Sequence, residues 1–225
     1  MITPISNLGT LGKVCAGVLS LSVALGLSGC ISVLPKAKPH QIYRLDAPID
    51  LGSEGLEEAR LVLIERPIAP RALINDKIAL AYPDGRIAYA AQSNWVSPVP
   101  ALIQDRVMDA YAAEIPEIAA VRSEDGVRAR WALRLEVRHF EALFDQGEDS
   151  APLVRVMMRA RIVDEQERSL ISSRTVESEV RARSRTVSAI VEAFDGASTE
   201  VSRTLVTWSR DVLAAQPQEG DAGED

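Results

Sequence analysis

Residues that could perform catalysis or bind a metal are scarce in this sequence. The chain contains two cysteines, Cys15 and Cys30, and two histidines, His40 and His139. A zinc site needs several cysteine, histidine or carboxylate ligands together, and we expect His139 to be a structural residue on the apolar face at the end of a strand. Phosphate-binding glycine loops and the nucleophile elbow of hydrolases are also missing. These features predict a protein that is not an enzyme and that holds no cofactor and no metal.

The Cys30 thiol follows a segment that looks like an export signal. Residues 14–27 are apolar and uncharged, and Lys13 precedes them. This order is typical of a secretory signal, and the apolar run is shorter than the roughly 20 residues that span a bilayer. The run ends in Leu-Ser-Gly-Cys, which resembles the bacterial lipobox. The resemblance implies cleavage between Gly29 and Cys30, a diacylglyceryl group on the Cys30 sulfur, and acylation of the new amino terminus. The alternative is an ordinary signal peptide that happens to end near a cysteine.

This interpretation predicts how the mature protein is attached. Cys15 would leave with the signal, so no disulfide could form in the mature chain. Stable anchoring takes two or more acyl chains, and a lipobox cysteine provides them, so no transmembrane helix is needed. By resemblance to enteric sorting rules, Ile31 after the cysteine favours the outer membrane over the inner one. We therefore expect a lipid-anchored protein on the periplasmic face of the outer membrane of a Gram-negative bacterium.

Composition divides the chain into four segments. We expect a signal peptide at residues 1–29, a lipidated tether at 30–40, one domain at 41–215, and a disordered acidic tail at 216–225. The whole chain has 25 lysines and arginines against 32 acidic residues, for a net charge of −7. An acidic chain without a basic, aromatic patch is a poor nucleic-acid binder. Nucleic acid is therefore excluded as a partner.

Hydrophobic spacing predicts the first half of the domain. Short strands are expected at 41–45 and 59–64, followed by a hairpin over 77–92 that turns at Pro83 and Gly85. Ile87 and Tyr89 are expected on the same face as Ile78 and Leu80. A helix should follow, with Ser97 as its N-cap, and should stop at Pro116. Its apolar stripe comprises Val99, Leu102, Ile103, Val107, Ala110 and Tyr111.

The second half has the strongest periodicity. Apolar and charged residues alternate from Trp131 to Val137 and from Val154 to Ile162, and more weakly over 170–182, which predicts strands with one buried face. Apolar residues then recur every three or four positions, as in a long helix that continues through Gly196. The stripe consists of Val187, Ile190, Phe194, Ala197, Val201, Leu205, Trp208 and Val212. These elements predict an α+β sandwich, in which a mixed, largely antiparallel sheet carries two amphipathic helices on one face.

Two sets of residues could contact a partner. The first is a row of arginines expected on the sheet face opposite the core, made up of Arg130, Arg134, Arg138, Arg155, Arg159 and Arg161. They could dock an acidic partner or lipid head groups, although cross-strand pairing with Glu136, Glu177 and Glu179 is the favoured interpretation. The second set is Tyr82, Arg86, Tyr89 and Trp95, where core packing and an exposed contact rim are both open for the aromatic residues.

The order of these motifs resembles a known family. Tyr43-Arg44-Leu45, the hairpin sequence Arg86-Ile87-Ala88-Tyr89, the helix entry from Trp95 to Pro100, and the Ala197 to Trp208 spacing are similar to the auxiliary lipoprotein component of ABC-type transporters. The resemblance covers roughly residues 27–213. The chain departs from the family pattern in having Pro98-Val99-Pro100 where a Pro-Pro pair is commoner, which hardly affects the prediction of a helix start.

The resemblance implies a fold similar to the N-terminal domain of TolB and a function by contact. It implies an auxiliary subunit that works with an MCE-domain protein, an inner-membrane permease and an ATPase to move phospholipid or other hydrophobic molecules between the envelope membranes. A ring-shaped MCE partner makes a homo-oligomer an expectation as well. The alternatives are a structural lipoprotein that assembles or plugs an outer-membrane β-barrel, a lipid-binding shuttle with its own cavity, and, at the lowest weight, a hydrolase.

Overall fold

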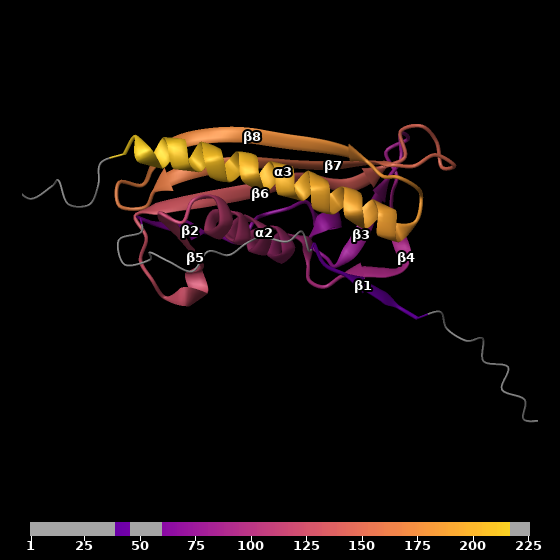
Figure 1. The fold of residues 1–225 in the computed structure, drawn as a ribbon, viewed down its shortest axis with the longest axis horizontal. Coiled ribbons are helices and arrows are strands. Elements are labelled where there is room, and N and C mark those ends of the chain that lie inside the picture. The colour runs from indigo at the N-terminus through magenta and orange to yellow at the C-terminus, as the bar shows by residue number, and fades with distance from the viewer. Residues whose placement is uncertain (1–38, 46–59, 217–225) are drawn as a thin grey trace, which may run out of the picture. The chain divides into compact units, whose positions relative to one another are not determined.

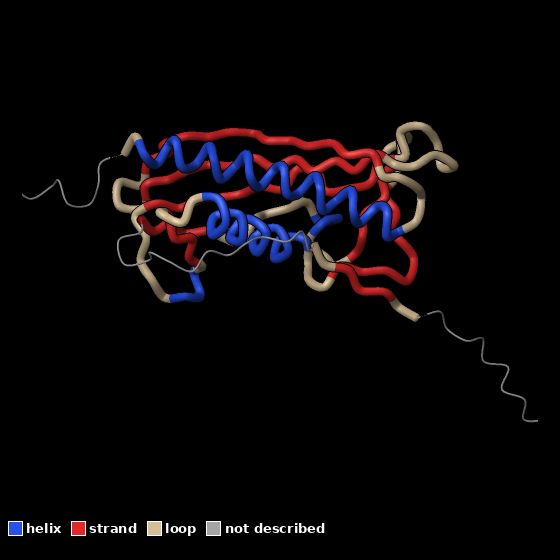
Figure 2. Tube along the Cα trace, viewed as in Figure 1, coloured by secondary structure: helices blue, strands red, loops and turns tan. Residues whose placement is uncertain are grey.

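A computed structural model describes residues 39–45 and 60–216. Cys30, the expected signal and most of the expected tether therefore lie outside the described residues, as does all but one residue of the expected tail. Figure 1 shows the fold, and Figure 2 separates its helices from its strands. In chain order the elements are β1 (Gln41–Tyr43), β2 (Arg60–Ile64), η2 (Arg71–Leu73), β3 (Lys77–Ala81), β4 (Ile87–Trp95), α2 (Val99–Glu114), β5 (Ile118–Val121), η3 (Ser123–Asp125), β6 (Trp131–Leu143), β7 (Leu153–Asp164), β8 (Ser169–Arg181) and α3 (Val187–Ala214).

The sheet has eight strands and is organised around β6. One edge of β6 pairs with β7, and β7 pairs with β8, both antiparallel. The other edge of β6 pairs in parallel with two short groups of strands. Strand β2 lies beside its first residues and also pairs with β5, while β3 lies beside its last residues and leads to β4 and β1. The expectation of a mixed α+β sheet is confirmed.

Both helices cover the same face of the sheet, as Figure 1 shows. Helix α3 contacts β7, β8 and α2, and α2 contacts β5. The 28 residues of α3 rise about 1.5 Å each and the 13 residues of β8 about 3.4 Å each, so the two elements are of similar length. Helix α3 can therefore cover the long strands from end to end.

The apolar stripes of both helices form the core, as predicted. All six residues of the α2 stripe are buried, and the α3 stripe is buried at Ile190, Phe194, Ala197, Val201 and Leu205. Helix α3 continues without a break through Gly196. At its start, Thr186 accepts a hydrogen bond through its side chain from the Ala189 amide. This N-cap satisfies one of the free amide groups of the first turn.

Two local expectations were wrong, and one strand was not predicted. Ser97 does not cap α2; Pro98 holds the N-cap position, and its carbonyl accepts hydrogen bonds from the Ala101 and Leu102 amides. Strand β5 was not expected, because only four residues with little alternation form it. In the hairpin, the turn does hold Gly85 at φ +85°, but the register sets Ile87 against Ala81 and Tyr89 against Ala79. Those two apolar residues therefore lie on the face opposite Leu80.

His139 also lies elsewhere than expected. The pairing of β6 with β7 shifts by one residue between Val137 and His139, which is a β-bulge. A bulge inserts an extra residue, so the side chains that follow it change faces. Phe140 and Ala142 consequently point into the core. His139 is half-exposed on the outer face, where Nδ1 lies 2.5 Å from Glu141 Oε1.

Candidate contact surfaces

The tip of the β3–β4 hairpin forms a three-layered stack of side chains. The Tyr82 ring stacks on Phe144, with ring centroids 5.4 Å apart and planes inclined by 11°. The guanidinium carbon of Arg86 lies 4.4 Å from the centroid of the same Tyr82 ring. A cation over an aromatic face is attracted by the ring's negative electrostatic potential. The hairpin tip is thus attached to the loop that follows β6.

Carboxylates hold Arg86 in this position. Its Nε donates to Asp84 Oδ2 at 2.6 Å and its Nη2 donates to Glu148 Oε1 at 3.1 Å. The hydrogen bond from Arg86 lowers the pKa of Asp84 below its ordinary value. In the loop that leads into α3, Arg185 donates to the Glu148 carbonyl and to Asp149. The loops at 82–86, 144–149 and 182–186 are therefore connected by charged side chains that remain solvent-exposed.

The other two candidate contact residues lie elsewhere. Trp95 is 2% exposed and packs edge-on against Phe194, with centroids 5.2 Å apart, and against Phe140, at 5.7 Å. The expectation that Trp95 could lie on a contact rim is therefore corrected: it is a core residue. Tyr89 is exposed on the opposite sheet face from Leu80, and its hydroxyl donates to the Ala72 carbonyl at 3.1 Å. The structure brings together only Tyr82 and Arg86.

The outer sheet face carries five of the six expected arginines, and most of these five are paired. Arg134 bridges Glu65 at 2.8 Å and Glu165 at 2.9 Å, while Arg138 contacts Glu136 at 2.5 Å. Arg161 reaches the same Glu136 at 3.4 Å, and neighbouring arginines lower the pKa of Glu136, chiefly through the hydrogen bond from Arg138. Exposed pairs of this kind contribute roughly 0–1 kcal/mol each.

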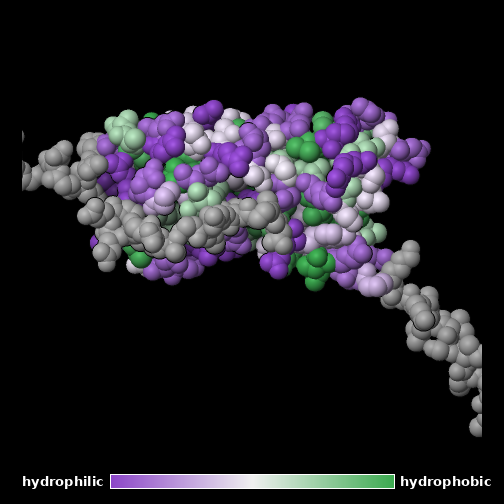
Figure 3. Space-filling model, in the orientation of Figure 1, coloured by the Kyte–Doolittle hydropathy of each residue, from purple (hydrophilic) through white to green (hydrophobic). Residues whose placement is uncertain are grey.

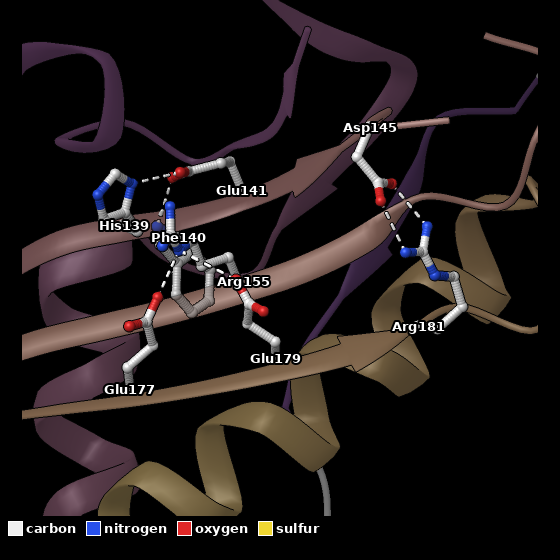
Figure 4. Close-up of polar contacts among 8 residues, drawn as sticks. All are labelled: His139, Phe140, Glu141, Asp145, Arg155, Glu177, Glu179 and Arg181. Atoms are coloured by element: carbon white, nitrogen blue, oxygen red, sulfur yellow. Dashed lines mark hydrogen bonds and ion pairs between the residues drawn. The ribbon is translucent and has the colours of Figure 1, made fainter. Parts of the chain in front are cut away.

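Figure 4 shows the end of this face that lies near the bulge. Arg155 on β7 sits in register between Glu141 on β6 and Glu179 on β8. It binds Glu177 as well as Glu179, and these bonds raise the pKa of Arg155, with the bond to Glu177 the largest cause. Further along, Asp145 and Arg181 form a two-pronged ion pair at 2.6 and 2.7 Å. This end of the face has more carboxylates than guanidinium groups.

The charge balance favours the pairing interpretation of the arginine row. The pairs to Glu136, Glu177 and Glu179 that alternation predicted are present. Arg130 does not belong to the face, because it lies just before β6, where Nε donates to the buried Asp164 at 3.0 Å. Burial raises the pKa of Asp164, but the Glu167 amide, Arg130 and the Gln166 amide together bring it below its ordinary value. Most arginines of the outer face therefore already have carboxylate partners.

Sequence reasoning missed the polar contacts between the two helices. Arg106 on α2 is 3% exposed, and its Nη2 donates to Asp195 Oδ1 at 2.7 Å and to Thr199 Oγ1 at 2.6 Å. Further along both helices, the Tyr111 hydroxyl lies 2.5 Å from Ser209 Oγ. The signal for Arg106 was its position: it immediately precedes Val107 and lies three residues after Ile103, at the margin of the apolar stripe.

A comparison with protein families identifies the chain. The family described as ABC-type transport auxiliary lipoprotein component matches residues 43–206. The chain belongs to this family. The resemblance inferred from the ordered motifs is therefore confirmed, and this auxiliary lipoprotein shares the family's general assignment to ABC-type transport.

Individual relatives support the fold. An uncharacterized protein of Bradyrhizobium diazoefficiens is 28% identical over 167 residues, which cover 74% of this auxiliary lipoprotein and 44% of the relative. The chain thus spans less than half the length of that relative. A crystal structure of a Xanthomonas campestris protein of a family of unknown function superposes with a TM-score of 0.68, at 22% identity, covering 77% of this chain and 97% of the other. A second crystal structure, of an uncharacterized protein, has a TM-score of 0.61, 14% identity and coverages of 76% and 99%.

Membrane-spanning helices and metal sites are two further features to consider in the auxiliary lipoprotein. Within residues 39–45 and 60–216, no helix is long and apolar enough to cross a membrane. Over the same residues, no three histidine, cysteine, aspartate or glutamate side chains are grouped as a metal would need. The surfaces that the structure does offer are the Tyr82–Arg86 stack and the outer sheet face.

Proposed function

We propose that this auxiliary lipoprotein is a non-catalytic subunit of an MCE-type ABC lipid transport system, anchored through acylated Cys30 to the periplasmic face of the outer membrane. It would hold the transporter's MCE-domain protein near that membrane while phospholipid or another hydrophobic molecule passes. Family membership is the observation that carries the proposal, because it assigns the chain to ABC-type transport. Residues 1–29 would be the signal, 30–40 the tether, 41–215 the contact domain, and 216–225 a tail.

The lipobox-like sequence supports the anchor. Leu-Ser-Gly-Cys follows an apolar, uncharged segment, and the family is one of lipoproteins. Anchoring by several acyl chains is stable without a membrane-spanning helix. A domain of this kind needs no catalytic groups, because its role would be to hold two other components together.

We place the contact with the MCE-domain protein at the Tyr82–Arg86 stack. Tyr82 and Arg86 are the two residue types that most often dominate binding energy when an interface covers them. Arg86 is exposed at the hairpin tip, and Tyr82 beside it is half-buried. Both are already ordered by contacts with Phe144, Asp84 and Glu148. A partner would therefore bind them without paying much for fixing flexible side chains.

The first test is purification of the full-length protein from mildly solubilised envelopes, with mass spectrometry of the proteins that co-elute. The proposal expects an MCE-domain protein together with its permease and ATPase. The same sample should show acyl chains on the fragment that begins with Cys30. Recovery of an outer-membrane β-barrel without any MCE-domain protein would instead favour the assembly-factor alternative.

A pair of substitutions tests the contact surface. Arg86→Glu should reduce the recovered MCE-domain protein at least fivefold, because it reverses the charge at the hairpin tip. Arg203→Glu is the matched control, since Arg203 is an arginine of similar exposure that forms an ion pair with Glu114 but lies on α3. Equal recovery with both variants would place the partner elsewhere on the domain.

The anchor is tested by Cys30→Ala in a form still exported to the periplasm. Transport should fall to the level of a strain lacking the protein, because the domain would no longer be held at the membrane. The readout is movement of labelled phospholipid between the two membranes. Full restoration of transport by the soluble form would contradict the tethering part of the proposal.

A further inference from the structure

Exposed apolar side chains gather at one place in the fold. Eight large apolar residues of the described part of the chain are exposed, and five of them belong to β1, β4 or the segments next to them. We call this set the β1–β4 apolar surface; it comprises Ile42, Ile74, Ile87, Tyr89 and Val96. Isolated exposed apolar residues need no explanation, whereas a group of them marks a contact site.

The strand registers bring four of these residues onto one sheet face. Ile42 pairs with Asn94, and Val96 lies two residues after Asn94, just past the end of β4, where its amide still donates to the Tyr43 carbonyl at 2.7 Å. Asn94 pairs with Lys77, and Tyr89 pairs with Ala79, with a register shift between the two pairs. Because Lys77 and Ala79 are two residues apart on β3, the side chains of Asn94 and Tyr89 lie on the same face. Ile87 lies two residues before Tyr89 on this face. Trp95, between Asn94 and Val96, points the other way into the core, as alternation requires.

The segment containing Ile74 lies against the same face. The Tyr89 hydroxyl donates to the carbonyl of Ala72, and Asn94 donates to Asp76 at 2.7 Å. Ile74 sits between these two contacts in the sequence and is 52% exposed. Viewed from the helix side, Figure 3 shows strongly hydrophobic atoms at the surface beside β1, at the lower edge of the molecule. The β1–β4 apolar surface thus extends around one end of the sheet.

Basic groups border the surface. Arg44 directly follows β1, and Arg71 begins η2 next to Ala72. Both are exposed, and neither forms an ion pair with another residue of the described ranges. Apolar side chains bordered by exposed cations are the combination that binds the interface of a bilayer containing anionic lipids.

We propose that the β1–β4 apolar surface rests on the lipid bilayer in which Cys30 is anchored, so that the domain is held in a fixed orientation. The inference relies on the lipid anchor of the proposed function. Ten residues, 31–40, separate Cys30 from β1, and they reach at most about 33–36 Å when fully extended. A short tether raises the effective concentration of its two ends to about the millimolar range. A weakly membrane-binding surface at β1 would then be occupied most of the time.

Position relative to the tether is what favours a bilayer over a protein partner. The tether joins the domain at β1, so Ile42 of this surface lies nearer Cys30 along the chain than any other exposed large apolar residue of the described ranges, such as Leu170 on β8. Tyr89 adds the amphipathic ring that is common at membrane interfaces. The Tyr82–Arg86 stack, at the hairpin turn, would remain free for a partner.

The test compares two single-cysteine labels on the acylated full-length mature protein. Val96→Cys is the probe, and Leu170→Cys is the control, because Val96 and Leu170 are equally exposed at 59% and 60%. The mature chain has no other cysteine than the acylated Cys30, so each variant takes one fluorescent label. The protein is reconstituted in vesicles of phosphatidylethanolamine and phosphatidylglycerol, with a nitroxide quencher on the lipid.

Lipid-borne quencher should reduce the fluorescence at position 96 at least threefold more than at position 170. Equal quenching at both positions in vesicles that carry the protein overturns the proposal. Protection of position 96 from a water-soluble quencher without quenching by lipid also overturns it and would indicate contact with a second protein copy. Failure of the anchor is separate: the protein would then lack acyl chains by mass spectrometry and would not float with the vesicles.

Discussion

At the scale of single residues, a few polar side chains join the two helices. The Arg106–Asp195 pair and the Tyr111–Ser209 hydrogen bond join α2 to α3. Ser209 Oγ also donates to the Val206 carbonyl at 2.8 Å, so Tyr111 can donate its hydroxyl proton to Ser209. A buried hydrogen bond stabilises the folded state by about 1 kcal/mol, and a buried polar group left without a hydrogen-bond partner destabilises it by more than that.

Tyr111 makes stability dependent on pH in the alkaline range. Burial is the larger cause that raises its pKa well above the ordinary 10.0, and the bond to Ser209 only partly opposes it. The folded state therefore keeps the proton that the unfolded state loses above pH 10. The resulting stabilisation is present below pH 10 and is lost as the pH rises toward the folded-state pKa.

Substitution of Tyr111 by phenylalanine should expose this dependence. At pH 8 we expect Tyr111→Phe to lower the free energy of unfolding by about 1 kcal/mol, through the lost hydrogen bond. Above pH 10 the difference from the unchanged protein should shrink by up to about 1.4 kcal/mol per pH unit. Urea unfolding from pH 8 to pH 11 measures both. A constant difference over that range would contradict the assignment.

At the scale of elements, two glycines have opposite roles. Gly85 closes the β3–β4 turn with φ +85°, and its amide donates a hydrogen bond to the Tyr82 carbonyl at 3.0 Å. Gly196 lies inside α3 with a helical backbone, where alanine is more stable than glycine. A β-carbon there would lie 4.0 Å from Val180 Cγ2, an ordinary contact. The two glycines therefore differ in backbone conformation and not in the space available for a β-carbon.

Alanine at these two glycines should shift stability in opposite directions. Gly85→Ala should lower the free energy of unfolding by about 1 kcal/mol, because a β-carbon is strained in the left-handed region. Gly196→Ala should raise it by about 1 kcal/mol, the usual difference between alanine and glycine inside a helix. Thermal unfolding of the two variants beside the unchanged protein measures both shifts. A stabilising Gly85→Ala would show that the turn does not need this conformation.

At the scale of the whole molecule, an aromatic cluster links the layers. Trp95 ends β4, Phe140 follows the β6 bulge and Phe194 belongs to α3, and each ring contacts the other two. The cluster therefore joins the β1–β4 end of the sheet, the central strand and the long helix. The bulge at Val137 and His139 is what turns Phe140 inward to complete it.

Removal of one ring from this cluster should destabilise the entire fold. Phe194→Ala should lower the free energy of unfolding by about 3–5 kcal/mol, because it leaves a cavity that three elements share. Leu170→Ala, at an exposed apolar site, should change it by no more than about 0.5 kcal/mol. Denaturant unfolding followed by Trp fluorescence and by circular dichroism should show one coincident transition. Separate transitions for the two signals would mean that the sheet end unfolds independently.

Local patterns in the sequence by themselves determined the long elements and the family. Strict alternation predicted β6 and β7, and an unbroken stripe predicted α3 through Gly196, because each pattern depends only on neighbouring residues along one element. The ordered motifs predicted the auxiliary lipoprotein family, which the family comparison confirmed. The ion pairs to Glu136, Glu177 and Glu179 also followed from the alternation.

Only the tertiary structure decided which strands become neighbours and which side chains meet. The parallel pairing of β2 and β3 along one edge of β6 joins segments far apart in the chain, and no local pattern specifies such partners. The bulge moved His139 outward and Phe140 inward, while the hairpin register separated Tyr89 from Tyr82. Trp95 became a core residue because Phe140 and Phe194 arrive from distant elements to cover it. Burial of this kind depends on long-range packing, which periodicity within one element does not contain.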